Sequence, residues 1–288
     1  MRGDGTGPGG ATRVLAVCAD DFGISPGISA GIARLATAGR LTAVSCLTNG
    51  PHWRSGAVLL NGLPATVDVG LHLNFTEGRP LSPRLAKLWP QLPSLPALIA
   101  RAHLGMLPRG ALRNEVHAQL AAFSRERGQP PAFIDGHQHV HHLPVLRGII
   151  LDMAEHLQPL PALRNTGRVL GPGADLKRWL IEHTGGRALA REIGQRQFAA
   201  NPVLLGTYDF VEPDYRSLMQ RWLAALPAAG GLLFCHPGDR NAGEAPDAIA
   251  AARRREAAYL GSDAFAADLA AAGVVLGRVW QTPLPAAA

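Results

Sequence analysis

Two adjacent carboxylates, Asp20 and Asp21, directly follow an apolar run from Val14 to Ala19. Such a run is typical of a short buried strand, and Gly23 with Ser25-Pro26-Gly27 then ends the strand and begins a helix whose N-cap is the serine. In α/β folds, ligands bind at the carboxyl ends of the strands, so both carboxylates are predicted to reach one site. Two like charges this close shift each other's pKa unless a cation lies between them. A solvated Asp-Asp turn is the alternative.

Further polar side chains follow two later strands. The segment from Ala65 to Asn74 alternates apolar and polar residues, which places His72 and Asn74 on one face at its carboxyl end. The segment from Phe133 to His142 is predicted to be a strand that runs into a loop. If the strand persists, a period of two brings one carboxylate and three imidazoles to one face: Asp135, His137, His139 and His141.

These residue types favour a metal site. Neutral imidazole is the commonest metal ligand in proteins, whereas a single isolated histidine is usually a core or surface residue. Asp21, His72 and His137 follow three different strands and make a set of two histidines and one carboxylate. Three protein ligands leave positions open for water and substrate, as a catalytic metal requires. Asp20 then remains beside the metal as a candidate general base.

Three more residues are candidates for supporting roles. His236 follows the predicted strand Gly231–Cys235 and could protonate a leaving group, or could only cap the strand end by hydrogen bonding. Asp135 could hold the far nitrogen of a ligating imidazole. Arg164, near the end of a predicted strand at 161–165, could orient Asp20 or bind substrate, or could be an ordinary surface arginine.

Strands and helices alternate along the chain, which predicts an α/β fold: a single parallel (β/α) barrel, TIM-like but distorted or incomplete. We expect a flexible tail over residues 1–11 and one barrel domain over residues 12–288. Five prolines between Pro80 and Pro96 interrupt regular structure, and two helices are predicted after them, at Leu95–Met106 and Arg109–Arg127. This insertion, at about residues 80–130, is a candidate lid or substrate platform, with a purely structural excursion as the alternative.

The composition of the chain argues against some classes of partner. The 288 residues are 47% hydrophobic and 17% charged, and no apolar run approaches the ~18 residues of a membrane span. The first ten residues lack the apolar region of a signal peptide, so we expect a cytoplasmic protein. The net charge of +6 is scattered except at Arg253-Arg254-Arg255, which is predicted to be the solvated face of a helix, so no nucleic-acid partner is expected. A homodimer is compatible with the chain.

The three cysteines, Cys18, Cys46 and Cys235, each lie in an apolar run without a CxxC spacing. They are predicted to be buried thiols rather than parts of a disulfide framework.

Four motifs together resemble the YdjC-like carbohydrate deacetylases, a family that includes chitooligosaccharide deacetylases and hopanoid-associated relatives. They are ADDFG at 19–23, GLHLN at 70–74, DGHQHVH at 135–141 and CHPG at 235–238. The resemblance implies a barrel related to polysaccharide deacetylases, one divalent metal ion (Mg²⁺ or Zn²⁺) and hydrolysis of an N-acetyl group on an amino sugar of an oligosaccharide or glycolipid. Carried over, Asp20 resembles the base and His236 the acid. The ligands implied are Asp21, His72 and His137, whereas the roles of His139 and His141 stay open.

Two other functions remain as alternatives. The same ligand set is the facial triad of non-haem iron oxygenases, which have no need of a base such as Asp20 beside the metal. A non-catalytic metal- or glycan-binding protein would keep the ligands but would need neither Asp20 nor His236. The bound metal, a requirement for oxygen, and the release of acetate distinguish the three.

Overall fold

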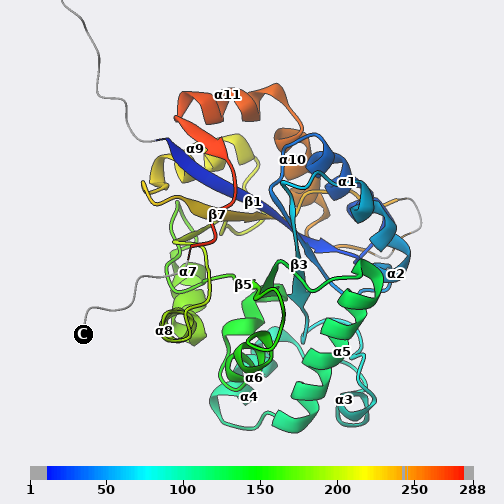
Figure 1. The fold of residues 1–288 in the computed structure, drawn as a ribbon. Helices are drawn as coiled ribbons and strands as arrows, with labels where there is room; N and C mark the ends of the chain where they lie inside the picture. Colours follow the sequence, from blue (N-terminus) through cyan, green and yellow to red (C-terminus); the bar gives the residue numbers. More distant parts are fainter. Residues whose placement is uncertain (1–11, 242–243, 245, 282–288) are drawn as a thin grey trace, which may run out of the picture.

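A parallel β-sheet forms the centre of the computed structural model, which describes residues 12–241, 244 and 246–281. Seven strands follow the order β5-β4-β3-β2-β1-β7-β6, and β8 pairs with the start of β1. The sheet is curled rather than flat (Figure 1). The strands are β1 (Arg13–Phe22), β2 (Ala43–Cys46), β3 (Asp68–Leu73), β4 (Phe133–Gly136), β5 (Ala162–Leu163), β6 (Leu204–Leu205), β7 (Gly231–Cys235) and β8 (Val274–Leu276).

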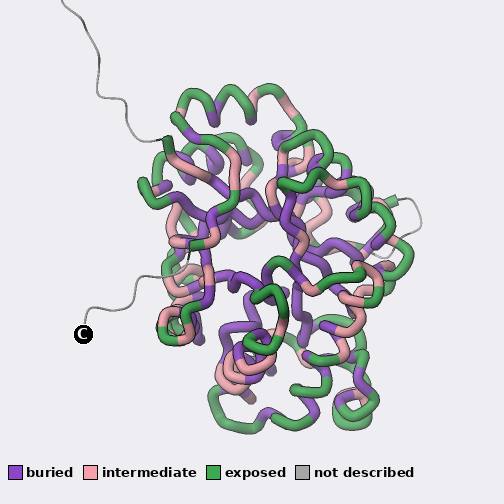
Figure 2. Tube along the Cα trace, viewed as in Figure 1, coloured by how far each residue is buried: buried purple, intermediate pink, exposed green. Residues whose placement is uncertain are grey.

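The helices surround this sheet, and burial is concentrated in the strands (Figure 2). Between β5 and β6 the described chain has only isolated bridges, Leu163 to Ala200 and Val169 to Leu204, so the barrel is incomplete. The predicted α/β fold, an incomplete parallel barrel, is confirmed. The α-helices are α1 (Pro26–Thr37), α2 (Trp53–Gly56), α3 (Pro83–Leu88), α4 (Leu95–His103), α5 (Arg109–Arg127), α6 (Leu146–Ala154), α7 (Asp175–Ile181), α8 (Arg187–Gln195), α9 (Tyr215–Ala225), α10 (Ala250–Leu260) and α11 (Asp263–Ala271).

The first turn of the chain is built as the sequence predicts. Ser25 is the N-cap of α1, and its side chain accepts a hydrogen bond from the backbone N–H of Ile28 at 3.2 Å. Pro26 supplies the fixed φ of the first helical position. Ile28 and Ile32 face the sheet and are fully buried. The cap and the apolar stripe together fix where the chain leaves β1.

The end of β1 differs from the prediction. We expected the strand to stop at Ala19, but it continues to Phe22 and contains both carboxylates. Ala19 pairs with Val44 while Phe22 pairs with Cys46, so β1 carries one extra residue there, a β-bulge. Asp21 takes a left-handed φ of 71° within it. The bulge breaks the alternation of the strand and lets two consecutive side chains reach the same site.

The segment between β3 and β4 holds α3, α4 and α5. The last two lie close to their predicted places, whereas the short helix α3 was not predicted, because it lies among the prolines. The segment's side chains Leu85, Leu98 and Phe123 are fully buried and belong to the main core, which also includes residues from Leu15 to Val274. The segment is therefore packed onto the barrel. Its action as a lid stays a prediction.

One of the predicted strands is shorter in the structure. The strand expected at 161–165 reduces to the two-residue strand β5. β6 also has two residues, and a π-turn at Glu182–Gly186 lies between α7 and α8. The three cysteines are buried and free, as predicted. Within the described residues, every helix is too short or too polar to be a membrane span. The tail predicted for residues 1–11 lies outside the described residues.

Candidate metal centre and active site

A cavity of about 600 Å³ opens at the carboxyl ends of β1, β3, β4 and β7. Its wall also includes apolar side chains from α4, from α7 and from the loops after β6 and around residue 248. Six of the ten predicted site residues line it: Asp20, Asp21, His72, His137, His139 and His236. The other four, Asn74, Asp135, His141 and Arg164, do not line it. Asp135 and Arg164 contact its polar end through His72 and Asp20, whereas His141 contacts the backbone of Arg164.

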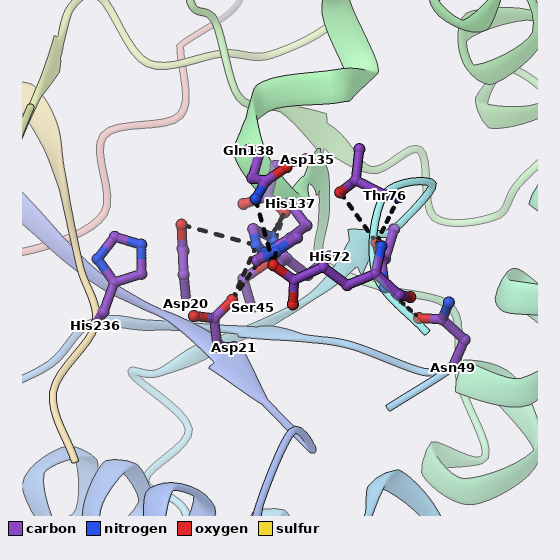
Figure 3. A network of polar contacts seen from close by, with 12 residues as sticks. Asp20, Asp21, Ser45, Asn49, His72, Thr76, Asp135, His137, Gln138 and His236 are labelled. Carbon is purple, nitrogen blue, oxygen red and sulfur yellow. Dashed lines mark hydrogen bonds and ion pairs between the residues drawn. The ribbon is translucent and has the colours of Figure 1, made fainter. Parts of the chain in front are cut away.

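Asp21, His72 and His137 converge at the polar end of the cavity (Figure 3). One oxygen of the carboxylate, Oδ1 of Asp21, lies 3.0 Å from Nδ1 of His137 and 3.6 Å from Nε2 of His72. One ligand atom from each of the three residues lies within 4.8 Å of the others, and all three side chains are buried. The spacing is that of groups able to bind one ion between them.

Asp135 fixes the imidazole of His72 from behind. It lies opposite His72 in the β3–β4 ladder, and its Oδ1 is 2.6 Å from Nδ1 of His72. The hydroxyl of Ser45 donates to the same Oδ1 at 2.6 Å. A carboxylate on Nδ1 assigns the proton to that nitrogen and leaves the lone pair of Nε2 directed at Asp21. This donor set, two imidazoles and a carboxylate with a carboxylate behind one imidazole, fits a divalent metal ion.

Asp20 is held by the fully buried Arg164, whose NH1 and NH2 donate to its two oxygens at 2.7 and 2.6 Å. The same NH2 lies 2.5 Å from Oδ2 of Asp135 and 3.1 Å from Sγ of Cys18. Cys18, Asp20 and Asp135 have the spacing of a second metal site, but the guanidinium already supplies the cation there. Of the two predictions for Arg164, contact with Asp20 agrees with the structure. Complete burial excludes an ordinary surface position.

The run from His137 to His142 is not an extension of β4. The strand ends at Gly136, and the run forms a 3₁₀ turn in which Gln138 and His139 take left-handed φ values of 53° and 61°. The segment is a strand that runs into a loop, as predicted, but the strand does not persist, so the four side chains do not share one face by a period of two. The turn sends His137 to Asp21, whereas Nε2 of His141 contacts the carbonyl oxygen of Arg164 at 2.9 Å.

Burial keeps the other histidines of this turn neutral. The ring of His139 packs edge-on against Phe234 and lies on the cavity wall. Desolvation lowers the pKa of His139 well below its usual range and lowers that of His141 to about 4. Desolvation likewise lowers the pKa of His142 well below its usual range. These three rings carry no charge near neutral pH.

His236 follows β7 and faces the cavity from the opposite side of the Asp20–Asp21 pair to His72 and His137 (Figure 3). Its ring packs edge-on against Phe210 and Phe234. Desolvation lowers the pKa of His236 to about 4, although the two aspartates raise it. Its Nδ1 has no hydrogen-bond partner within the described chain. The imidazole is therefore neutral at rest, and this nitrogen is buried without a partner among the described residues.

A family model described as YdjC-like protein matches residues 14–271. The chain belongs to the YdjC-like family. A human relative named "Carbohydrate deacetylase" is 32% identical, over 91% of this chain and 88% of that protein. A mouse protein of the same name is 38% identical over 53% of this chain and 52% of its own length. A "Chitooligosaccharide deacetylase" from Proteus mirabilis is 35% identical over 50% and 56%. The chain thus aligns with about half the length of some relatives and most of another.

A solved structure supports the fold of this YdjC-like chain. A crystal structure from Enterococcus faecalis V583, of a protein to which cellobiose-phosphate cleavage has been ascribed, superposes with a TM-score of 0.70. It covers 93% of this chain and 98% of that one, at 20% sequence identity. The likeness is one of architecture.

Asn74 stabilises the loop after β3 and does not line the cavity. Its Oδ1 accepts hydrogen bonds from the backbone N–H groups of Thr76 and Glu77 at 3.0 and 3.1 Å, while its backbone is held by Gln119 of α5. The loop brings Oε1 of Glu77 to 3.2 Å from Nε2 of His137. Asn74 therefore contributes to this site of the YdjC-like chain by placing Glu77, which the sequence analysis did not select.

Arg253 is the second residue that the sequence analysis missed. The run Arg253-Arg254-Arg255 was expected to be solvated, but Arg253 is 3% exposed and its NH2 donates to Oδ2 of Asp21 at 2.7 Å. The burial of Asp21 raises its pKa, but Arg253 and His137 lower it more, and the pKa lies well below its usual range. A helical spacing through Arg253, Glu256 and Leu260, all buried, is the sequence signal that could have revealed it.

Proposed function

We propose that this YdjC-like protein is a metal-dependent hydrolase that removes an N-acetyl group from an amino sugar of an oligosaccharide or glycolipid and releases acetate. The observation that carries the proposal is the convergence of Asp21, His72 and His137 in one cavity, with the second carboxylate, Asp20, beside them. The relatives named carbohydrate deacetylase and chitooligosaccharide deacetylase support the same reaction class.

Asp21, His72 and His137 would hold one divalent ion, with Asp135 keeping the imidazole of His72 in its ligating tautomer. The ion, Zn²⁺ or Mg²⁺, would supply Lewis-acid chemistry for activating water and stabilising the developing oxyanion. With three protein ligands, positions remain for water and for the acetamide oxygen.

Asp20 is proposed to take the proton from the attacking water. It lies beside the ligand set, with Oδ2 4.0 Å from Nε2 of His72. Arg164 holds both of its oxygens, which fixes the orientation of the carboxylate. The thiol of Cys18 also donates to Oδ1 at 3.6 Å, so Oδ2 is the oxygen that keeps a lone pair for a proton. Geometry of this kind is required of a general base before its pKa matters.

His236 is proposed to give a proton to the departing amine. Because its pKa is about 4, the ring enters the reaction neutral and must gain a proton after substrate has bound. Negative charge that develops on the reacting carbonyl would favour that uptake. The side chain lines the cavity, which is the position that such a transfer requires.

The remainder of the cavity suits a sugar ring with an attached apolar group. Phe210 and Phe234 flank His236, and Ile99 and Leu143 line the wall further away. Aromatic and aliphatic walls bind the apolar faces of a ligand, while a few polar groups orient it. This lining supports an amino sugar within a larger molecule as the substrate.

The test is a panel of acetylated amino sugars incubated with metal-loaded protein, with acetate as the product measured. We expect acetate release that stops on chelation, and no release from His72→Ala or His137→Ala, which should also lose the metal. His156→Ala, a change at an exposed histidine, is the matched control.

Other outcomes of the panel would contradict the proposal. Full metal occupancy in both variants would refute the ligand assignment. Consumption of oxygen or 2-oxoglutarate without acetate would indicate an oxygenase, and glycan affinity without acetate release a binding protein. Location in the cytoplasm and a homodimer stay predictions that this panel does not address.

A further inference from the structure

The two oxygens of Asp21 have separate partners. Oδ1 faces the imidazoles of His137 and His72, at 3.0 and 3.6 Å. Oδ2 accepts a hydrogen bond from NH2 of Arg253 at 2.7 Å. A carboxylate can bind a metal through one oxygen or through both. In this structure a buried guanidinium already binds the second oxygen.

Arg253 is itself anchored on its far side. Its Nε donates to Oδ2 of Asp247 at 2.7 Å, and its NH1 lies 3.4 Å from the carbonyl oxygen of His236. Burying a guanidinium is costly unless it is paired, and here Asp21 and Asp247 both pair with it. The side chain therefore bridges α10, the cavity wall at Asp247 and the strand that carries Asp21, and has little freedom to leave Oδ2.

The bridge has two consequences for a cation bound at Oδ1. Oδ2 cannot turn toward the ion without losing a charge-assisted hydrogen bond. The positive charge of Arg253, in contact with the same carboxylate, also opposes a bound cation. Both effects weaken the hold of Asp21 on the ion and keep the number of protein donor atoms at three, one from each ligand.

We propose that Arg253 is a positioning residue that keeps Asp21 a one-oxygen ligand and so preserves an open coordination position for water and substrate. The inference rests on the proposed metal centre. Under this proposal Arg253 favours catalysis but lowers the affinity of the site for the metal. A residue needed only for folding would not have these two opposite effects.

The test compares Arg253→Gln with wild type and with Arg254→Gln, a change at the exposed neighbour on the same helix. The metal dissociation constant is measured by competition with a chelator, and coordination is read from the electronic spectrum of the cobalt(II)-loaded protein. We expect Arg253→Gln to bind metal roughly tenfold more tightly, because an opposing charge has gone and Oδ2 is released. Its cobalt spectrum should shift to that of a higher coordination number, and deacetylation should fall by about tenfold or more. Arg254→Gln should match wild type.

A folded Arg253→Gln protein with unchanged or weaker metal affinity and a wild-type cobalt spectrum would overturn the inference. If that variant does not fold, Arg253→Lys decides, since one ammonium group cannot bridge Asp21 and Asp247 as the guanidinium does. Its cobalt spectrum should differ from wild type, and identity with wild type in both spectrum and affinity would overturn the inference. Absence of metal binding in wild type would instead refute the proposed function, which the first measurement reveals.

Discussion

The burial of His141 predicts a specific loss of stability in mild acid. The side chain is 1% exposed, its Nε2 contacts the carbonyl oxygen of Arg164, and desolvation lowers its pKa to about 4 although Asp135 raises it. In the unfolded chain the pKa returns to about 6.5. Between these two values the unfolded state binds a proton that the native state does not, so the free energy of unfolding falls as the pH falls below about 6.5.

The size of this loss of stability follows from the pKa shift of His141. Each pKa unit corresponds to about 1.4 kcal/mol, and pH 5 lies about 1.5 units below the unfolded pKa, so His141 alone removes about 2 kcal/mol at that pH. His141→Gln removes the titrating group, and its side-chain amide can still donate to the Arg164 carbonyl. The variant is therefore less sensitive to acid than wild type, whatever its stability at neutral pH.

The assay is urea unfolding of chelator-treated wild type and His141→Gln at pH 7.5 and pH 5. Between pH 7.5 and pH 5, the free energy of unfolding of wild type should fall by about 2 kcal/mol more than that of His141→Gln. Carboxylates and the other buried histidines titrate in both proteins and cancel in the difference. His156→Gln, at an exposed histidine, should show no such change. A difference independent of pH would refute the claim that His141 is neutral in the native state.

Three further predictions concern the proposed reaction. Asp20→Asn should keep the metal and lose about 10²–10⁴-fold in turnover, the usual size of a general-base effect, whereas Asp21→Asn should lose the metal; equal behaviour would contradict the separation of roles. His236→Ala should bind metal and cleave acetamides poorly but retain more activity on an activated aryl acetate, whose leaving group needs no proton; an equal loss on both would exclude the acid role. Ile99→Ala on the cavity wall should change KM among acetylated substrates more than Tm, and a fall in Tm with unchanged preference would favour a structural role for α4.

The sequence predicts the architecture well because its signals are local. Ser25 and Pro26 mark the start of α1, and the alternation around His72 marks β3. The bulge in β1 could not be predicted, because it depends on how β1 pairs with β2, and pairing is a contact between distant segments. The shortness of β5 and β6 has a similar cause: each pairs with one neighbouring strand, β4 or β7, and only isolated bridges lie between the two in the described sheet.

The candidate metal centre is only partly predictable from the sequence, because its contacts join distant segments of the chain. Carboxylates and imidazoles after strands are visible in the sequence, but where the strand gives way to the turn at His137–His142 is not, and that turn separates His137 from His141. Arg253 was missed because three adjacent arginines are usually solvated, whereas only one of them lies on the buried side of α10. Which arginine that is follows from helical spacing, but its partner, Asp21, follows only from the fold.

Arg164 binds both Asp20 and Asp135, and this contact has a consequence for the metal-free protein. A guanidinium is covalently part of the chain, so no chelator can remove it and no change of pH near neutrality can discharge it. We therefore expect the carboxylate proposed as the base, and the one that fixes His72, to keep their places whether or not an ion is bound. Stripping the protein of metal should accordingly be reversible inactivation, in which adding the ion back restores activity at once, without refolding.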